Sequence, residues 1–174
     1  MPGSHMVYTG NIVFESENRK RKDRYTLKNI VLIGMPGAGK STIGVVIAKK
    51  LGYRFMDSDL VIQERTGKML HEIIEEKGTE GFLTVEGEIN ASLCCDRTVI
   101  ATGGSVVYSA KAMEHLKEIG RVVYLQLSCE AVAERLGDLQ ERGVALKEGQ
   151  TLRDLYEERT PLYERYADIT LNCE

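Results

Sequence analysis

A glycine-rich segment at residues 34–42 carries the clearest chemical signal in the chain. It reads Gly-Met-Pro-Gly-Ala-Gly-Lys-Ser-Thr and matches the P-loop pattern G-x-x-x-x-G-K-S-T. Glycines let the backbone turn tightly, so that successive N–H groups point at phosphate oxygens. Lys40 can reach the outer phosphates of a bound nucleotide, and the Ser41 hydroxyl can bind Mg²⁺. The pattern predicts an ATP site made by Gly37, Ala38, Gly39, Lys40, Ser41 and Thr42.

The segments on either side of this loop support the same interpretation. The apolar run 29–33 is typical of a buried parallel strand. Residues 41–51 carry apolar side chains at helical spacing. A helix that begins directly after the loop turns its positive dipole end and free N–H groups toward a phosphate. A chance glycine-rich turn is the alternative, and this context argues against it.

Two carboxylates, Asp57 and Asp59, flank Ser58 just after a short predicted strand. An acidic residue of P-loop enzymes holds Mg²⁺ directly or through water, and we predict this role for Asp57. Asp59 would then face the acceptor and take the proton from its hydroxyl group. The alternative is that an aspartate here caps the next helix. One aspartate can cap while the other serves the reaction.

A polar, glycine-spaced segment at about residues 137–150 has the character of a lid. It is longer than most connections, whose median length is about 4–6 residues. Arg142 within it could swing over the γ-phosphate, stabilise transition-state charge and exclude water. The alternative is a surface arginine in a mobile loop.

Strand and helix signals alternate along the chain, which predicts an α/β fold with a parallel sheet. We expect three layers, α/β/α, as in P-loop kinases, with about five central strands and a lid. Ligands of such sheets bind at the carboxyl ends of the strands, where the P-loop, Asp57, Asp59, Gly103 and Gly104 should share one cleft. The predicted strands are 29–33, 53–56, 98–102, 121–127 and 168–171, and the helices are 41–51, 60–66, 69–93 (broken near Gly78 and Gly81), 109–119, 128–136 and 151–166.

The bulk composition indicates an ordinary globular protein. The chain has 174 residues, 43% of them hydrophobic and 28% charged, which favours one domain. We assign residues 1–6 to an expression-tag remnant, 7–28 to an N-terminal extension and 29–174 to the domain that carries the P-loop. A basic run at 18–24 could serve nucleic acid or targeting, but a solvated lead-in to the first strand is the better interpretation.

Charge and cysteine spacing exclude several classes of partner. The net charge of −3 gives no reason to expect nucleic acid. No apolar run approaches the roughly 20 residues of a membrane span. The four cysteines lack metal-ligand spacing, which indicates reduced thiols. We therefore expect a cytoplasmic protein that binds small molecules, and we expect it to be a monomer.

The ordered motifs resemble those of the shikimate kinases, in the P-loop fold group that includes nucleoside monophosphate kinases. The likeness runs from about Ile30 to Leu171. Members carry a P-loop, D-x-D, G-E-x-x-F-R-x-x-E, a G-G-G turn, a lid arginine before P-L-L, R-x-P-x-Y and A-D. This chain has Gly34 to Thr42, Asp57 to Asp59, Phe82 with Glu86, Gly103 with Gly104, Arg142, Arg159 to Tyr163 and Ala167 with Asp168.

The resemblance implies transfer of the γ-phosphoryl group of ATP to the 3-hydroxyl of shikimate, in aromatic amino-acid biosynthesis. Lys40, Asp59 and Arg142 would be the catalytic residues. Ser41 and Asp57 would serve Mg²⁺. Arg135 resembles the arginine that lies against the adenine.

The resemblance also implies an acceptor site. Asp59 would bind the acceptor hydroxyls, and Arg159 would contact the carboxylate. Gly103 and Gly104 would let the backbone approach the acceptor closely. The partners implied are ATP and a small hydroxylated acceptor, with shikimate expected.

Most departures from the family pattern fall in the acceptor site. The family arginine of F-R-x-x-E is Leu83 here, the preceding glutamate is Thr79, and the third glycine is Ser105. The lid also differs, with Arg142 followed by Gly-Val-Ala instead of P-L-L. A hydrogen bond to a charged group contributes about 1.5–3 kcal/mol, so its loss would weaken acceptor binding roughly 10- to 150-fold. Leu83 is expected to make the pocket wall apolar.

Two alternatives to a shikimate kinase therefore stay open. The chain could phosphorylate another small polyol or hydroxy acid, as gluconate kinases of the same fold group do. It could also be a nucleotide-binding homologue that no longer catalyses. The intact Lys40, Ser41, Asp57, Asp59 and Arg142 speak against the second alternative.

Overall fold

The computed structural model describes residues 29–136 and 149–174. The predictions for residues 1–28 therefore lie outside the described part of the chain. So does nearly all of the predicted lid, including Arg142.

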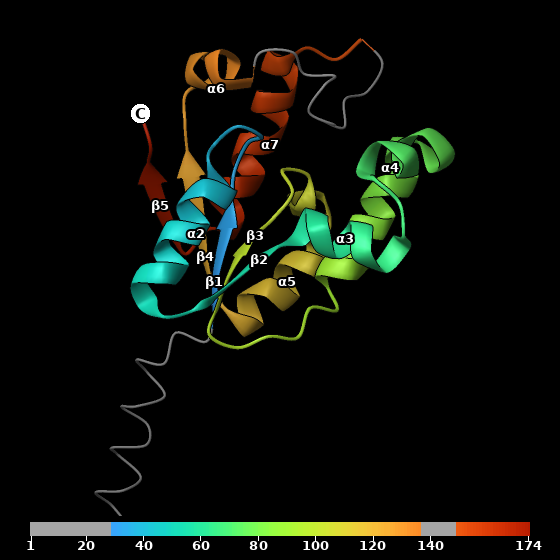
Figure 1. The fold of residues 1–174 in the computed structure, drawn as a ribbon. Helices are drawn as coiled ribbons and strands as arrows, with labels where there is room; N and C mark the ends of the chain where they lie inside the picture. Colours follow the sequence, from blue (N-terminus) through green and yellow to red (C-terminus); the bar gives the residue numbers. More distant parts are fainter. Residues whose placement is uncertain (1–28, 137–148) are drawn as a thin grey trace, which may run out of the picture.

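A sheet of five parallel strands forms the centre of the described fold (Figure 1). The strand order is β2-β3-β1-β4-β5, so the chain starts in the middle and builds toward both edges. Val31 of the central strand lies opposite Ile100 on one side and Val122 on the other. The predicted parallel sheet is confirmed. The strands are β1 (Asn29–Ile33), β2 (Arg54–Asp57), β3 (Thr98–Ala101), β4 (Arg121–Gln126) and β5 (Ile169–Asn172).

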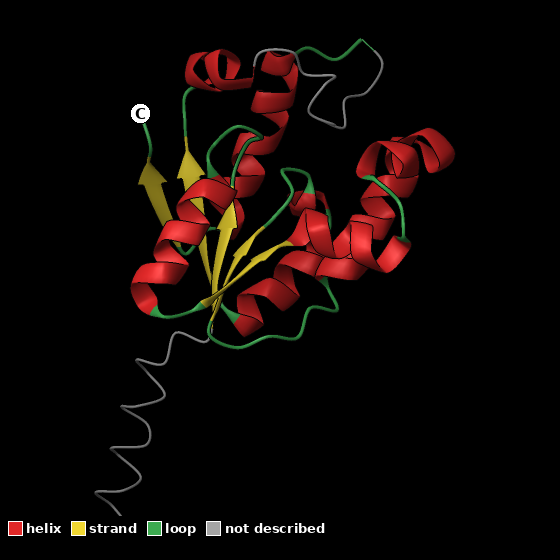
Figure 2. Cartoon of the chain, in the orientation of Figure 1, coloured by secondary structure: helices red, strands yellow, loops and turns green. Residues whose placement is uncertain are grey.

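The helices cover both faces of this sheet, which confirms the three layers. Crossovers between parallel strands are almost always right-handed. The step from β1 to β2 runs toward one edge, whereas the later steps run toward the other, so α2 lies on the opposite face from α5 and α7. Figure 2 shows α2 in front of the sheet. The helices are α2 (Lys40–Leu51), α3 (Ser58–Thr66), α4 (Leu70–Asn90), α5 (Ala110–Ile119), α6 (Cys129–Leu136) and α7 (Leu152–Tyr166).

The helix ends follow the polar caps in the sequence. Ser109 accepts a hydrogen bond from the Ala112 N–H at the start of α5, and Thr151 caps α7. Gly78 interrupts α4 with a left-handed φ of 70°, as predicted, because a glycine adopts this conformation without strain. The predicted break at Gly81 is wrong, since Gly78 alone is non-helical inside α4. A short 3₁₀ turn, η1 (Val106–Tyr108), was not expected.

The strand ends bring distant parts of the sequence to one edge of the sheet. Ala101 pairs with Leu32 of β1 on one side and with Asp57 of β2 on the other. The residues that follow these three strands therefore emerge side by side. Val31, Leu32 and Ile33 are fully buried beneath them and fix that edge. Within the described ranges, no helix combines the length and apolarity that a membrane crossing requires.

Candidate active site

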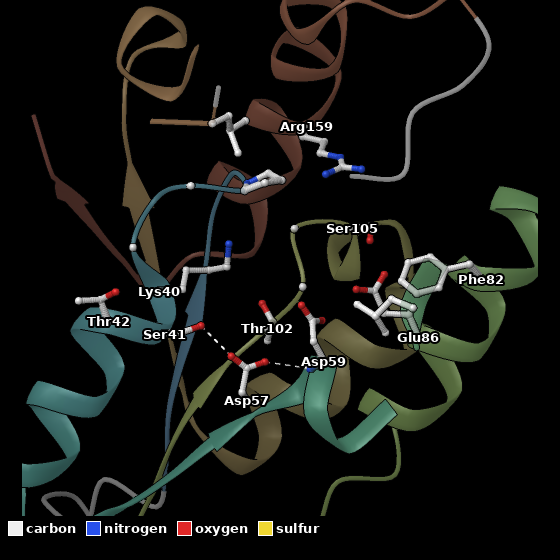
Figure 3. Close-up of a pocket in the computed structure, with 17 residues that line it drawn as sticks. Lys40, Ser41, Thr42, Asp57, Asp59, Phe82, Glu86, Thr102, Ser105 and Arg159 are labelled. Atoms are coloured by element: carbon white, nitrogen blue, oxygen red, sulfur yellow. Dashed lines mark hydrogen bonds between the residues drawn. The ribbon is translucent and has the colours of Figure 1, made fainter. Parts of the chain in front are cut away.

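One cavity of about 360 Å³ opens at the carboxyl ends of β1, β2 and β3 (Figure 3). The structure brings most of the predicted site residues together in its wall. Ala38 is fully buried behind the loop. The predicted residues that line the cavity are Gly37, Gly39, Lys40, Ser41, Thr42, Asp57, Asp59, Gly103, Gly104 and Arg159.

The P-loop holds Lys40 against its own backbone. Gly39 has a left-handed φ of 86° and starts α2, a conformation that side chains other than glycine rarely adopt. The Lys40 Nζ donates hydrogen bonds to the carbonyls of Gly34 at 2.8 Å and Met35 at 3.0 Å. Burial lowers the pKa of Lys40 to about 8, an effect that the nearby Asp59 carboxylate opposes. The loop thus presents a buried cation beside free N–H groups at a helix start.

Ser41 and Asp57 form a pair of oxygen ligands beside the P-loop. The Ser41 hydroxyl donates to Asp57 Oδ2 at 2.7 Å, and Asp57 Oδ1 accepts the Asp59 N–H at 3.0 Å. Asp57 therefore caps α3, which confirms the capping interpretation, and its contact with Ser41 leaves the Mg²⁺ role a prediction. Hydroxyl and carboxylate oxygens suit Mg²⁺, which commonly adds substrate phosphates to one or two protein ligands. In the described ranges, no cluster of three or more histidine, cysteine or acidic side chains could enclose a metal.

Two carboxylates line the cavity, the half-buried Asp59 and the buried Glu86. Asp59 Oδ1 and both carboxylate oxygens of Glu86 accept no hydrogen bond within the described part of the chain. Burial and the neighbouring Asp57 raise the pKa of Asp59 to about 6. Burial raises the pKa of Glu86 to about 7, and the Ser105 hydroxyl partly opposes that shift. Both groups therefore titrate close to neutral pH.

The turn after β3 needs its glycines because side chains crowd against it. A Cβ at Gly103 would lie 2.2 Å from Glu86 Oε1 and 3.0 Å from Asp59 Oδ1. The Gly103 N–H donates to the Ser58 hydroxyl at 3.2 Å, which ties the turn to α3. The Tyr163 hydroxyl donates to the Gly104 carbonyl and ties the turn to α7. This contact gives a structural reason for the tyrosine of the R-x-P-x-Y motif.

Arg159 enters the cavity from α7, one helical turn before Tyr163. Its side chain is only 1% exposed. Its Nε donates to the Tyr108 hydroxyl at 3.2 Å, and its guanidinium lies 5.2 Å from the centre of the Tyr108 ring. A Cβ at Gly104 would lie 3.1 Å from Arg159 Nη1. The glycine turn and the tyrosine together orient the arginine.

Leu83 does not line the main cavity, so the expected apolar wall there is wrong. It lines a neighbouring cavity of about 170 Å³, together with Thr79, Tyr108 and Arg159. The helical turn of α4 directs Phe82 and Glu86 into the main cavity and turns Leu83 aside. The two cavities share Arg159.

Arg135 lies on α6, next to the P-loop. A Cβ at Gly37 would lie 3.2 Å from the Leu136 side chain and 3.7 Å from Arg135 Cβ. The Arg135 guanidinium donates to the Cys173 carbonyl at 3.1 Å. The end of α6 is therefore a neighbour of the nucleotide loop. Leu136, unlike Arg135, lines the main cavity.

Several cavity residues were not assigned a role from sequence. The helical spacing of Phe82 and Glu86, four residues apart, could have placed both on one face of α4. No local signal marks Leu136 or Tyr108, because their positions depend on how α6, η1 and α7 pack. The unassigned residues of the main cavity are Pro36, Leu70, Phe82, Glu86, Thr102, Ser105 and Leu136.

Comparisons with known proteins agree with this geometry. The family profile described as shikimate kinase matches residues 36–174. The shikimate kinase of Persephonella marina is 36% identical over 149 residues, which cover 85% of this chain and 90% of that protein. That of Methylococcus capsulatus is 40% identical over 148 residues, 83% of each chain.

A solved structure gives the same result in three dimensions. The shikimate kinase of Acinetobacter baumannii, in complex with shikimate, superposes with a TM-score of 0.77 at 38% sequence identity. The match covers 88% of this chain and 87% of that one. Profile, sequence relatives and solved structure agree over most of the chain, and this protein therefore belongs to the shikimate kinase family, whose members are phosphotransferases that act on an alcohol group.

Proposed function

We propose that this protein transfers the γ-phosphoryl group of ATP to the 3-hydroxyl of shikimate. The observation that carries the proposal is the cavity in which the buried P-loop lysine, the half-buried Asp59 and the buried Arg159 meet. The relative from Acinetobacter baumannii was solved in complex with shikimate, which supports the same acceptor.

On the nucleotide side, the residues Gly37 to Thr42 would hold the phosphates through their N–H groups. Lys40 would leave the two P-loop carbonyls and bind the outer phosphates. Ser41 and Asp57 would hold Mg²⁺, which neutralises phosphate charge when bound. Arg135 would lie against the adenine, and Arg142 would come from the lid, outside the described residues.

On the acceptor side, Asp59 would accept the proton of the attacking hydroxyl. The hydroxyl oxygen forms a bond to the γ-phosphorus as the bond to the bridging oxygen breaks, and ADP leaves with that electron pair. A pKa of about 6 keeps Asp59 ionised at neutral pH and still basic enough to take a proton. Arg159 would bind the carboxylate of shikimate, with Gly103 and Gly104 at close approach.

We also propose that the protein acts as a monomer in the cytoplasm. All four cysteines are free thiols, as expected for a reducing compartment. Light scattering after size-exclusion chromatography measures the mass in solution. A mass near 19.5 kDa is expected, and twice that mass would contradict the monomer.

The first test is ADP release from Mg²⁺ and ATP, with and without millimolar shikimate. Strong stimulation is expected. If ATP binds and shikimate gives no stimulation, the acceptor assignment is wrong. ATP binding without release of ADP toward any hydroxylated acceptor would instead support the non-catalytic homologue.

A further inference from the structure

Glu86 is a buried acid whose ionised form is favoured only in part, by the Ser105 hydroxyl and by the charges of Arg159 and Lys40. Its side chain is 1% exposed, it lines the main cavity, and neither carboxylate oxygen accepts a hydrogen bond within the described ranges. A buried, unpaired carboxylate is costly, so such groups are usually paired or protonated. A ligand group that donates hydrogen bonds to Glu86 would therefore stabilise its ionised form.

The Asp59 carboxylate converges with Glu86 on the same space. Glu86 Oε1 and Asp59 Oδ1 both lie against the Gly103 backbone, next to the position that a Cβ at Gly103 would take, so the two oxygens are neighbours at the edge of the cavity. Figure 3 shows the Asp59 and Glu86 carboxylates beside the turn that follows β3, with the Ser105 oxygen just above the Glu86 carboxylate. Two acceptors that converge in this way suit a ligand that donates hydrogen bonds and carries positive charge.

Two cationic side chains of the cavity wall, Lys40 and Arg159, attract the Glu86 charge but donate hydrogen bonds to other groups. Lys40 donates to the carbonyls of the P-loop, on the phosphate side. Arg159 donates through Nε to Tyr108. Leu83, three residues before Glu86 on α4, is uncharged.

We propose that the acceptor site also takes a hydroxylated amino acid as a further substrate. Glu86 binds its ammonium group, Arg159 binds its carboxylate, and Asp59 receives its hydroxyl. An ammonium group has three donors and no acceptor, so it can serve Glu86 and still reach the Asp59 side. This inference rests on the kinase activity proposed above and changes only the acceptor.

The phosphoryl transfer to the amino acid forms and breaks the same bonds as the transfer to shikimate. The amino-acid hydroxyl oxygen bonds to the γ-phosphorus while the bond to the β,γ-bridging oxygen breaks. The hydroxyl proton goes to Asp59, and ADP leaves. The ammonium group stays charged throughout, because Glu86 holds it away from the reacting oxygen.

The experiment compares matched acceptors that differ in the ammonium group. L-serine, L-threonine and L-homoserine are each assayed beside 3-hydroxypropanoate, 3-hydroxybutanoate and 4-hydroxybutanoate, with shikimate in parallel. At least one amino acid is expected to exceed its counterpart in kcat/KM by roughly 10- to 150-fold, the range for a hydrogen bond to a charged group. If no amino acid exceeds its counterpart, the inference is overturned.

The same assay separates this inference from the proposed function. If shikimate is phosphorylated and none of the amino acids is, the inference is overturned and the shikimate kinase proposal stands. If an amino acid is phosphorylated and shikimate is not, the inference is supported and the shikimate kinase proposal is overturned. If nothing is turned over, titration calorimetry with ADP and Mg²⁺ decides, since heat of binding from an amino acid alone supports the ammonium site and its absence contradicts it.

Two variants test the role of Glu86 directly. Glu86→Gln is expected to abolish the preference for the aminated acceptor over its counterpart. Leu83→Arg should do the same in a protein that keeps Glu86, because a guanidinium three residues away on the helix can pair with it. Circular dichroism checks that each variant folds. A preference that survives in either folded variant would show that Glu86 is not the ammonium site.

Discussion

The two halves of the cavity are built in different ways. The phosphate half comes mainly from one continuous segment, residues 34–42, and its polar groups are paired: Lys40 bonds two carbonyls and Ser41 bonds Asp57. The acceptor half gathers side chains from α3, α4, the β3 turn and α7, and among the described residues no donor bonds Asp59 Oδ1 or either carboxylate oxygen of Glu86.

This difference follows from what each half must recognise. Phosphates are the same for every ATP-dependent enzyme, so one local loop with fixed N–H groups suffices. An acceptor is recognised by charges placed around its own shape, and these must come from several elements. Changes on the phosphate side should therefore stop all transfer, whereas changes on the acceptor side should alter which substrate is used.

The largest effect is expected on the phosphate side. Lys40→Ala should lower kcat/KM for every acceptor by roughly 1,000-fold or more, because it removes the buried cation that meets the outer phosphates. Lys50→Ala, an exposed lysine on the same helix, is the matched control and should leave kcat/KM unchanged. If Lys40→Ala releases ADP at the wild-type rate, the P-loop does not take the predicted part in the reaction.

Asp59→Asn should lower kcat by roughly 100-fold, the lower end of the range for a general base. Phosphoryl transfer depends mostly on positioning and charge neutralisation, so the larger losses are not expected. Steady-state kinetics with saturating shikimate measures this change. If KM rises and kcat stays unchanged, Asp59 binds the acceptor without accepting its proton.

The pH profile of kcat/KM should show two limbs. Asp59 must be ionised to accept a proton, and burial raises its pKa to about 6, so activity should fall as the pH drops below that value. Lys40 must be charged, and burial lowers its pKa to about 8, so activity should also fall above that value. An acid limb that persists unchanged in Asp59→Asn would belong to another group.

Leu83→Arg should lower the KM for shikimate roughly tenfold, because it adds a second cation beside Arg159 for the carboxylate. Leu83→Met is the control, since it keeps the volume without the charge. If the arginine leaves KM unchanged or raises it, position 83 does not reach the shikimate carboxylate, or shikimate is not the acceptor.

The smallest effect is expected for Tyr108→Phe, which removes the hydroxyl that meets Arg159 Nε. A neutral hydrogen bond contributes about 0.5–1.5 kcal/mol, so KM for shikimate should rise roughly two- to tenfold while kcat stays constant. Tyr156→Phe removes a hydroxyl that bonds Leu127, away from the cavity, and should change neither constant. A fall in kcat alone for Tyr108→Phe would contradict a positioning role.

The sequence predicted the structural features that depend on residues close together in the chain. Apolar runs and caps located the described strands and most helix ends, and the P-loop pattern located the loop and α2, because these signals are local in the chain. The D-x-D pair also lay where expected, since Asp57 ends β2 and caps α3. The roles of these residues in the reaction stay predictions.

Only the tertiary structure decided how the acceptor half is composed. The isolation of Glu86 depends on the distances among α4, the β3 turn and α7, which no local pattern contains. Leu83 was expected in the cavity wall but lies beside it, because the helical turn that points Phe82 and Glu86 inward points Leu83 away. Sequence thus determined the P-loop and its flanking strand and helix, whose geometry is short-range, whereas long-range packing decided which charged side chains line the other half of the cavity.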